Sequence, residues 1–142
     1  DCAPLFDLID PLFQAGLPVH AMRDPTRGGL ATTLNEIASA AKVRIEIDED
    51  QLPVRPSVQG AAEIFGFDPL YLANEGKVVL CLPAEFAGPA LELFRKHPLG
   101  DGAAVIGRVL DGAGRPAVTL RTQIGGSRIL DMLVGEQLPR IC

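Results

Sequence analysis

The stretch Met22-Arg23-Asp24-Pro25-Thr26-Arg27-Gly28-Gly29 links two segments with different hydrophobic patterns. Residues 19–22 predict a short strand, and residues 30–41 repeat apolar side chains at the three- and four-residue spacing of an amphipathic helix. The free N–H groups of a helix N-terminus attract anions, and glycines let a backbone approach a ligand closely. The stretch therefore predicts a phosphate-binding turn between a strand and a helix, with Thr26 or Asp24 capping the helix.

The sequence alone leaves other interpretations of this turn open. Asp24 could bind a metal ion, or it could orient one of the arginines that flank the turn, Arg23 and Arg27. The turn could also be an ordinary capped helix start with both arginines solvated, since glycines are frequent at such junctions. A Walker loop is excluded because the pattern Gly-x-x-x-x-Gly-Lys is missing.

Hydrophobic patterning in the rest of the chain predicts an irregular mixture of helices and strands. The apolar run at 77–82 is expected to be a central strand, and residues 111–114 are expected to connect two strands as a hairpin. Because helices and strands do not alternate strictly, we expect an α+β fold, with helices packed on a mixed or antiparallel sheet. The other expected helices are 4–13, 58–65 and 85–96, and the other expected strands are 43–47, 104–110, 117–121 and 128–133.

The composition is that of one folded domain, with 142 residues of which 47% are hydrophobic and 22% are charged. A net charge of −5 and only 5% aromatic residues argue against a nucleic-acid-binding protein. No apolar run approaches the roughly 20 residues that span a bilayer. The three cysteines form no Cys-x-x-Cys pair, which argues against a disulfide framework or a zinc site. We therefore expect a cytoplasmic protein without nucleic-acid or membrane partners.

The segment Asn74-Glu75-Gly76-Lys77 leads into the apolar run at 77–82. A carboxylate at the mouth of an apolar strand, beside an amide and a glycine, could act as a general base or as a metal ligand. The spacing alone favours a simpler interpretation, in which Glu75 is solvated and Gly76 supplies a positive φ for a turn.

The last residue of the sequence, Cys142, carries the strongest soft nucleophile available to the chain. Arg140 would favour its thiolate form, whereas a terminal carboxylate would oppose it. Residues 135–142 have no hydrophobic period, so we expect a flexible tail that carries the thiol to a site elsewhere or to another protein. The alternative is an arbitrary chain end that happens to be cysteine. Cys81 is expected to be a small core residue, and Cys2 carries no signal.

Three segments of the chain together resemble the HypE family of hydrogenase maturation factors: residues 22–31, residues 73–77 and the ending Pro139-Arg140-Ile141-Cys142. The first segment by itself would indicate only the wider superfamily of aminoimidazole ribonucleotide synthetase and selenophosphate synthetase. The terminal cysteine selects HypE. The resemblance covers the whole chain and implies the C-terminal domain of the aminoimidazole ribonucleotide synthetase-like fold, with a domain at 1–134 and a tail at 135–142.

The resemblance implies a reaction that ends in a cyanide ligand. HypE proteins receive a carbamoyl group on the C-terminal cysteine from the HypF carbamoyltransferase, and use ATP to dehydrate it to a thiocyanate. They pass the cyano group to iron on the HypC–HypD complex, for the centre of [NiFe]-hydrogenase. The resemblance makes Cys142 the carrier thiol and Glu75 the base of the dehydration. The residues that it places at the nucleotide site are Asp24, Thr26, Arg27, Gly28, Gly29 and Asn74.

The resemblance also implies that much of the enzyme lies elsewhere. In this family an N-terminal half holds most of the ATP-binding residues, the carboxylates for Mg²⁺ and the main homodimer surface. Because the sequence begins at Asp1 instead of Met, we expect a piece of a larger protein. The resemblance implies that this piece binds ATP poorly by itself and carries no metal site of its own. Two alternatives stay open: a non-catalytic carrier and docking fragment, or another ATP-dependent enzyme of the superfamily.

Overall fold

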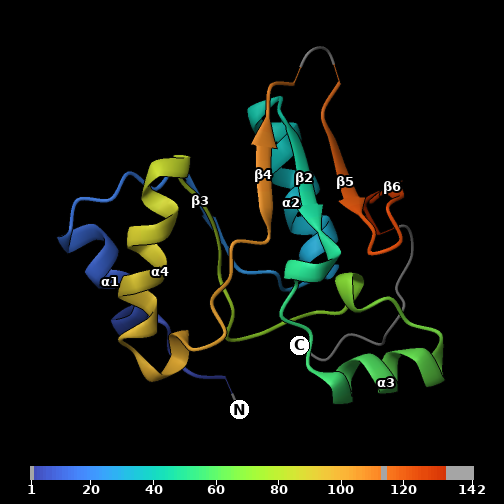
Figure 1. Ribbon diagram of the computed structural model, residues 1–142, viewed down its shortest axis with the longest axis horizontal. Coiled ribbons are helices and arrows are strands. Elements are labelled where there is room, and N and C mark those ends of the chain that lie inside the picture. The colour runs from blue at the N-terminus through green and yellow to red at the C-terminus, as the bar shows by residue number, and fades with distance from the viewer. Residues whose placement is uncertain (1, 113–114, 134–142) are drawn as a thin grey trace.

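A computed structural model of the chain describes residues 2–112 and 115–133. Its helices and strands form two units, seen side by side in Figure 1. In the first unit, two helices pack together over a two-stranded antiparallel sheet. Side chains from both helices and from the strand β3 form its small apolar core. The elements of this unit are α1 (Phe6–Gln14), β1 (Ala21–Arg23), β3 (Val79–Cys81) and α4 (Ala87–Arg95).

The second unit is a four-stranded mixed sheet with the helix α2 packed on one face (Figure 1). The strand order is β4-β2-β5-β6, in which β2 pairs antiparallel with β4 and parallel with β5. Ile45 and Ile47 of β2 are buried with Val118 and Leu120 of β5 in the main core. The elements of this unit are α2 (Gly29–Ala41), β2 (Arg44–Asp48), β4 (Gly107–Leu110), β5 (Ala117–Arg121) and β6 (Ser127–Ile129).

The helix α3 (Pro56–Phe65) lies at the edge of the molecule in Figure 1 and buries only Ala62. It leads to the one-turn helix η2 (Pro69–Tyr71), which packs against α2. The carboxylate of Asp68 accepts a hydrogen bond from the Leu70 N–H and so caps η2. The other one-turn helices are η1 (Glu49–Gln51), η3 (Ala84–Phe86) and η4 (Pro98–Gly100).

The predicted α+β fold, with helices on a mixed sheet, is confirmed. The predicted alternation at 43–47 is also confirmed, because Ile45 and Ile47 are buried while Arg44 is exposed. No helix in the described ranges is long and apolar enough to cross a membrane. The expected domain boundary at 134 and the expected tail at 135–142 lie outside the described residues.

The prediction of a hairpin at 111–114 is wrong. Strands β4 and β5 do not pair with each other, because β2 lies between them and pairs with both. Gly112, which suggested the hairpin, is explained by a close contact instead. A Cβ at this position would lie 1.8 Å from the Lys42 carbonyl oxygen. Gly112 is therefore required where the chain passes the start of β2 at van der Waals distance.

The prediction of a central strand at 77–82 is also wrong. The strand β3 belongs to the two-stranded sheet, and its residues are only half-buried. Leu80 of β3 and the following Leu82 pack against the helices α1 and α4 instead of between two sheets. An apolar run indicates that a strand is buried, but it does not indicate whether helices or other strands pack against it.

Candidate functional site

Strands β1 and β3 bring the two motif segments together. They pair antiparallel, with Arg23 opposite Val79, so the segment after β1 runs beside the segment before β3. The N–H of Asn74 donates a hydrogen bond to the Pro25 carbonyl at 2.9 Å. The turn at 24–29 and the segment 74–77, far apart in the sequence, are therefore neighbours at one end of the small sheet.

The segment 75–77 leaves the regular pairing of these strands. Continued past Arg23, the ladder would place Lys77 opposite Pro25, but the bond to Pro25 comes from Asn74. Residues 75–77 therefore form an excursion, and Gly76 makes the reversal with a φ of 65°. Glu75 lies on this excursion and is exposed. The predicted turn with a positive-φ glycine is confirmed.

The prediction that Thr26 or Asp24 caps α2 is wrong. The N-cap residue is Gly28, and no side chain hydrogen-bonds to the first turn. Gly28 and Gly29 both have positive φ, of 76° and 63°, so the chain reverses immediately before the helix. The capping position thus falls on a residue without a side chain. The N–H of Gly29 is satisfied by the Thr26 carbonyl at 3.0 Å.

The two glycines of the turn are explained by contacts within the chain. A Cβ on Gly28 would lie 2.2 Å from Thr32 Oγ1, and a Cβ on Gly29 would lie 2.5 Å from the Leu70 carbonyl oxygen and 2.6 Å from that of Leu72. Gly29 lets the segment 70–72 pass directly over the start of α2, and Gly28 leaves room for the Thr32 side chain. Their presence therefore does not require a ligand, and their assignment to a nucleotide site stays a prediction.

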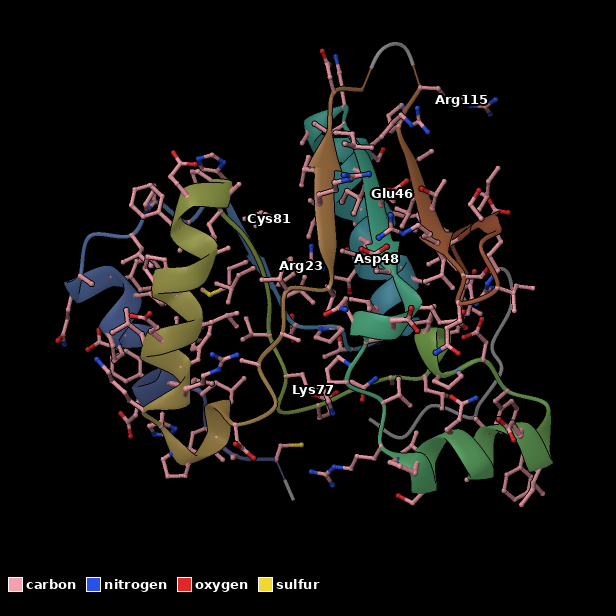
Figure 2. All side chains as sticks on the ribbon, in the orientation of Figure 1. Arg23, Glu46, Asp48, Lys77, Cys81 and Arg115 are labelled. Carbon is pink, nitrogen blue, oxygen red and sulfur yellow. The ribbon has the colours of Figure 1, made fainter. Side chains whose placement is uncertain are left out.

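The charges around the turn are unevenly paired. Arg23 forms an ion pair with Glu36 of α2 at 2.8 Å, so it is not simply solvated. Arg27 and Asp24 are exposed, and the ion pairs found among residues 2–112 and 115–133 do not include them. The Nζ of Lys77 donates to Asn74 Oδ1 at 3.0 Å. Figure 2 places Arg23 and Lys77 near the junction of the two units.

An open groove of about 260 Å³ lies beside the two motif segments. Its lining is mostly apolar and includes both positively and negatively charged side chains. Two of the side chains that line the groove, Arg23 and Lys77, are cationic and could meet a phosphate group. The part of the chain that the structure describes contains no group of three or more His, Cys, Asp or Glu side chains able to hold a metal ion. The residues that line the groove are Leu5, Ile9, Met22, Arg23, Asp24, Lys77 and Val78.

Sequence reasoning missed the part that η2 plays in this site. The carbonyls of Leu70 and Leu72 lie against Gly29, and the Leu72 carbonyl also accepts a hydrogen bond from Asn74 Nδ2 at 2.9 Å. The only local signal was the Asp68-Pro69 pair, which is typical of a capped helix start. That signal indicates a turn of helix but not what the turn contacts.

The predicted carrier thiol of Cys142 lies outside the described residues, whereas the other two thiols are described. Cys2 is exposed, and Cys81 on β3 is half-buried, so its predicted place in the core is only partly right. Burial raises the pKa of the Cys81 thiol above its usual value. Less thiolate at a given pH means a weaker nucleophile at this position.

Alkylation should distinguish these two thiols. With iodoacetamide near pH 8, we expect Cys2 to be modified several-fold faster than Cys81, because Cys81 has a raised pKa and limited access. Peptide mapping by mass spectrometry measures both rates in one sample. Unfolding the protein in urea should remove the difference, and a difference that persisted in urea would contradict the explanation by burial.

Comparisons with known proteins identify the same family that the sequence motifs resemble. The profile of the family described as "AIR synthase related protein, C-terminal domain" matches residues 1–118. The carbamoyl dehydratase HypE of Rhodobacter capsulatus is 53% identical to the whole of this chain, which spans 42% of that relative. The chain therefore covers less than half the length of such relatives.

Solved structures of HypE proteins superpose closely on the fold. A crystal structure of the hydrogenase maturation protein HypE matches with a TM-score of 0.92 at 48% identity, over 99% of this chain and 45% of that chain. A HypE structure in complex with ATP matches at 0.88 and 48% identity, over 96% and 42% of the two chains. A HypE–HypF complex matches at 0.87 and 45% identity, over 94% and 43%.

The family model covers most of the chain, and the sequence relative and the solved structures cover nearly all of it. The chain belongs to the family of AIR synthase related C-terminal domains, and within it to the HypE type.

Proposed function

We propose that this chain is the C-terminal domain of an ATP-dependent carbamoyl dehydratase of the HypE type. The observation that carries the proposal is the hydrogen bond between Asn74 and Pro25, which joins the two motif segments into one site. The identity of 53% to a carbamoyl dehydratase over the whole chain supports it. So does the close match to a HypE structure that contains ATP.

The proposed reaction starts from a carbamoyl group on the Cys142 sulfur. Dehydration converts S–C(=O)–NH₂ into S–C≡N: the C–O bond breaks, and both N–H protons leave as the triple bond forms. An amide oxygen is a poor leaving group, and ATP when bound supplies the phosphoryl group with which that oxygen leaves as phosphate. The protein must place the thiol arm, accept a proton from nitrogen and stabilise the negative charge.

Glu75 is the proposed proton acceptor. Its exposed position on the excursion 75–77 leaves its carboxylate accessible to a group brought in from outside. The neighbouring turn at 24–29 carries the exposed cationic residue Arg27, and we propose that phosphate groups bind near this turn. The residues proposed at the nucleotide are Asp24, Thr26, Arg27, Gly28 and Gly29.

The rest of the activity requires groups beyond this chain. The open groove suits a domain that contributes only part of an ATP site. We propose that Mg²⁺ is held by the phosphates and by carboxylates of the remaining protein, which also forms the homodimer. The proposed partners are HypF, which supplies the carbamoyl group, and the HypC–HypD complex, which receives cyanide on iron; a HypE–HypF complex is known for a similar protein.

Replacing Glu75 with glutamine tests the proposed base. In the full-length protein, Glu75→Gln should accept the carbamoyl group normally but form thiocyanate about 100-fold more slowly, because an amide cannot accept the proton. Intact-protein mass spectrometry separates the two adducts by the mass of water.

A matched control is Glu63→Gln, since Glu63 is an exposed helix residue whose carboxylate only accepts a hydrogen bond from Gln59. It should load and dehydrate like the unmodified protein. Thiocyanate formation at the normal rate by Glu75→Gln would remove Glu75 from the role of base.

A further inference from the structure

Asn74 holds the carboxylate-bearing excursion against the rest of the domain. Its backbone N–H donates to the Pro25 carbonyl at 2.9 Å, across the gap between the two motif segments. Its Nδ2 donates to the Leu72 carbonyl at 2.9 Å. Its Oδ1 accepts from Lys77 Nζ at 3.0 Å. Asn74 is half-buried, whereas Glu75 beside it is exposed.

These bonds connect the two ends of the excursion to each other and to the turn at 24–29. Residues 75–77 lie outside the β1–β3 ladder. Asn74 precedes this excursion, and Lys77 is its last residue. The side-chain hydrogen bond between Asn74 and Lys77 joins the two ends of the excursion. The hydrogen bond from the Asn74 N–H to the Pro25 carbonyl connects them to the turn at 24–29. These bonds restrain the two ends of the short segment that carries Glu75.

The same bonds leave Asn74 poorly suited to bind a nucleotide. Both polar atoms of its side chain already have partners within the chain. An amide that turned to a ligand would give up a bond to a main-chain carbonyl and a bond to a cation. The sequence-based assignment placed Asn74 at the nucleotide site. The hydrogen bonds of Asn74 favour a different role, in which it holds the segment 75–77 in place.

We propose that Asn74 is a positioning residue for the reaction, which acts by presenting Glu75 from a fixed turn and not by binding nucleotide. The inference rests on the proposed function of Glu75 as the base. Ordering a residue costs about 1–2 kcal/mol of conformational entropy, so a turn that is ordered in advance spares the reaction this cost. A base displaced by about 1 Å loses much of its effect on the rate.

The test compares Asn74→Ala with the unmodified full-length protein, after Cys142 has been loaded with the carbamoyl group. Single-turnover thiocyanate formation at saturating ATP should slow roughly tenfold. The Kd for ATP and the rate of loading should stay unchanged. Asn74→Asp keeps the acceptor for Lys77, and its rate should lie between those of Asn74→Ala and the unmodified protein.

Asn35→Ala is the matched control for a merely structural effect. Asn35 also uses its side-chain amide to hold the fold, donating to the carbonyls of Ala31 at 2.9 Å and Leu130 at 2.8 Å, but it lies on α2 away from the excursion. Its variant should dehydrate normally once folded. Circular dichroism and urea unfolding establish that each variant is folded under the assay conditions.

Three results would overturn the positioning role. Weaker ATP binding by Asn74→Ala with a normal rate at saturating ATP would make Asn74 a ligand contact. An equal slowing in Asn35→Ala would make its role structural. A normal rate in Glu75→Gln would overturn both this inference and the proposed base, and is recognised independently of any Asn74 variant.

Discussion

Carbamoyl loading of the full-length protein is expected to disappear completely in Cys142→Ala. A thiolate is the only group at this position that can attack the carbamoyl donor, and alanine offers no replacement nucleophile. The measurement is the mass of the intact protein after incubation with the carbamoyltransferase and its substrates. Without loading there is no substrate for dehydration, so thiocyanate should be absent as well.

The other thiols provide the control for this prediction. Cys2→Ala removes an exposed thiol, and Cys81→Ala removes a half-buried thiol whose pKa is raised by burial. Both variants should load to the same extent as the unmodified protein. A carbamoyl adduct that survived in Cys142→Ala would show that another residue carries the group, and peptide mapping would identify it.

The second large effect is expected from Gly29→Ala, which should lower the free energy of unfolding by about 2–5 kcal/mol. The added Cβ would lie 2.5 Å and 2.6 Å from the carbonyl oxygens of Leu70 and Leu72, and 2.8 Å from the Tyr71 carbonyl carbon. Main-chain atoms cannot turn away as a flexible side chain can. The φ of 63° adds a further cost for any residue with a Cβ.

Gly16→Ala separates these two causes. Gly16 has a similar φ of 70°, but nothing lies within 4 Å of the position of its Cβ. It should therefore lose only about 1–2 kcal/mol, the cost of the backbone conformation. Urea unfolding of the 142-residue chain measures both values. Equal losses in the two variants would contradict the close contact between α2 and the segment 70–72.

Secondary structure was predictable where a residue's surroundings depend on its near neighbours. The helix over residues 30–41 follows from apolar side chains that recur on one face, and the structure has α2 at Gly29–Ala41. The alternation in β2 likewise identifies a strand with one buried face. Strand pairing was not predictable in this way. The expected hairpin between β4 and β5 fails because β2 lies between them and pairs with both, a pairing between distant segments that no local pattern reports.

The candidate site was predictable as chemistry and not as geometry. Residue types alone identified three candidate groups: the Glu75 carboxylate, the turn flanked by Arg23 and Arg27, and the Cys142 thiol. The meeting of the first two segments at Asn74 and Pro25 depends on the register of β1 and β3, which no local pattern reports. The capping prediction failed for a different, local reason. Thr26 is a good N-cap residue, but two positive-φ glycines move the cap to Gly28.

What the sequence determined by itself is the set of functional groups, the family and the α+β class. Periodicity and motifs are properties of consecutive residues, so a single chain displays them before it folds. Only the tertiary structure decided that Gly29 lies beneath the segment 70–72 and that Asn74 ties Glu75 to the turn at 24–29. These contacts join residues distant in the chain, and they form only when burial of the two apolar cores selects one arrangement of strands and helices.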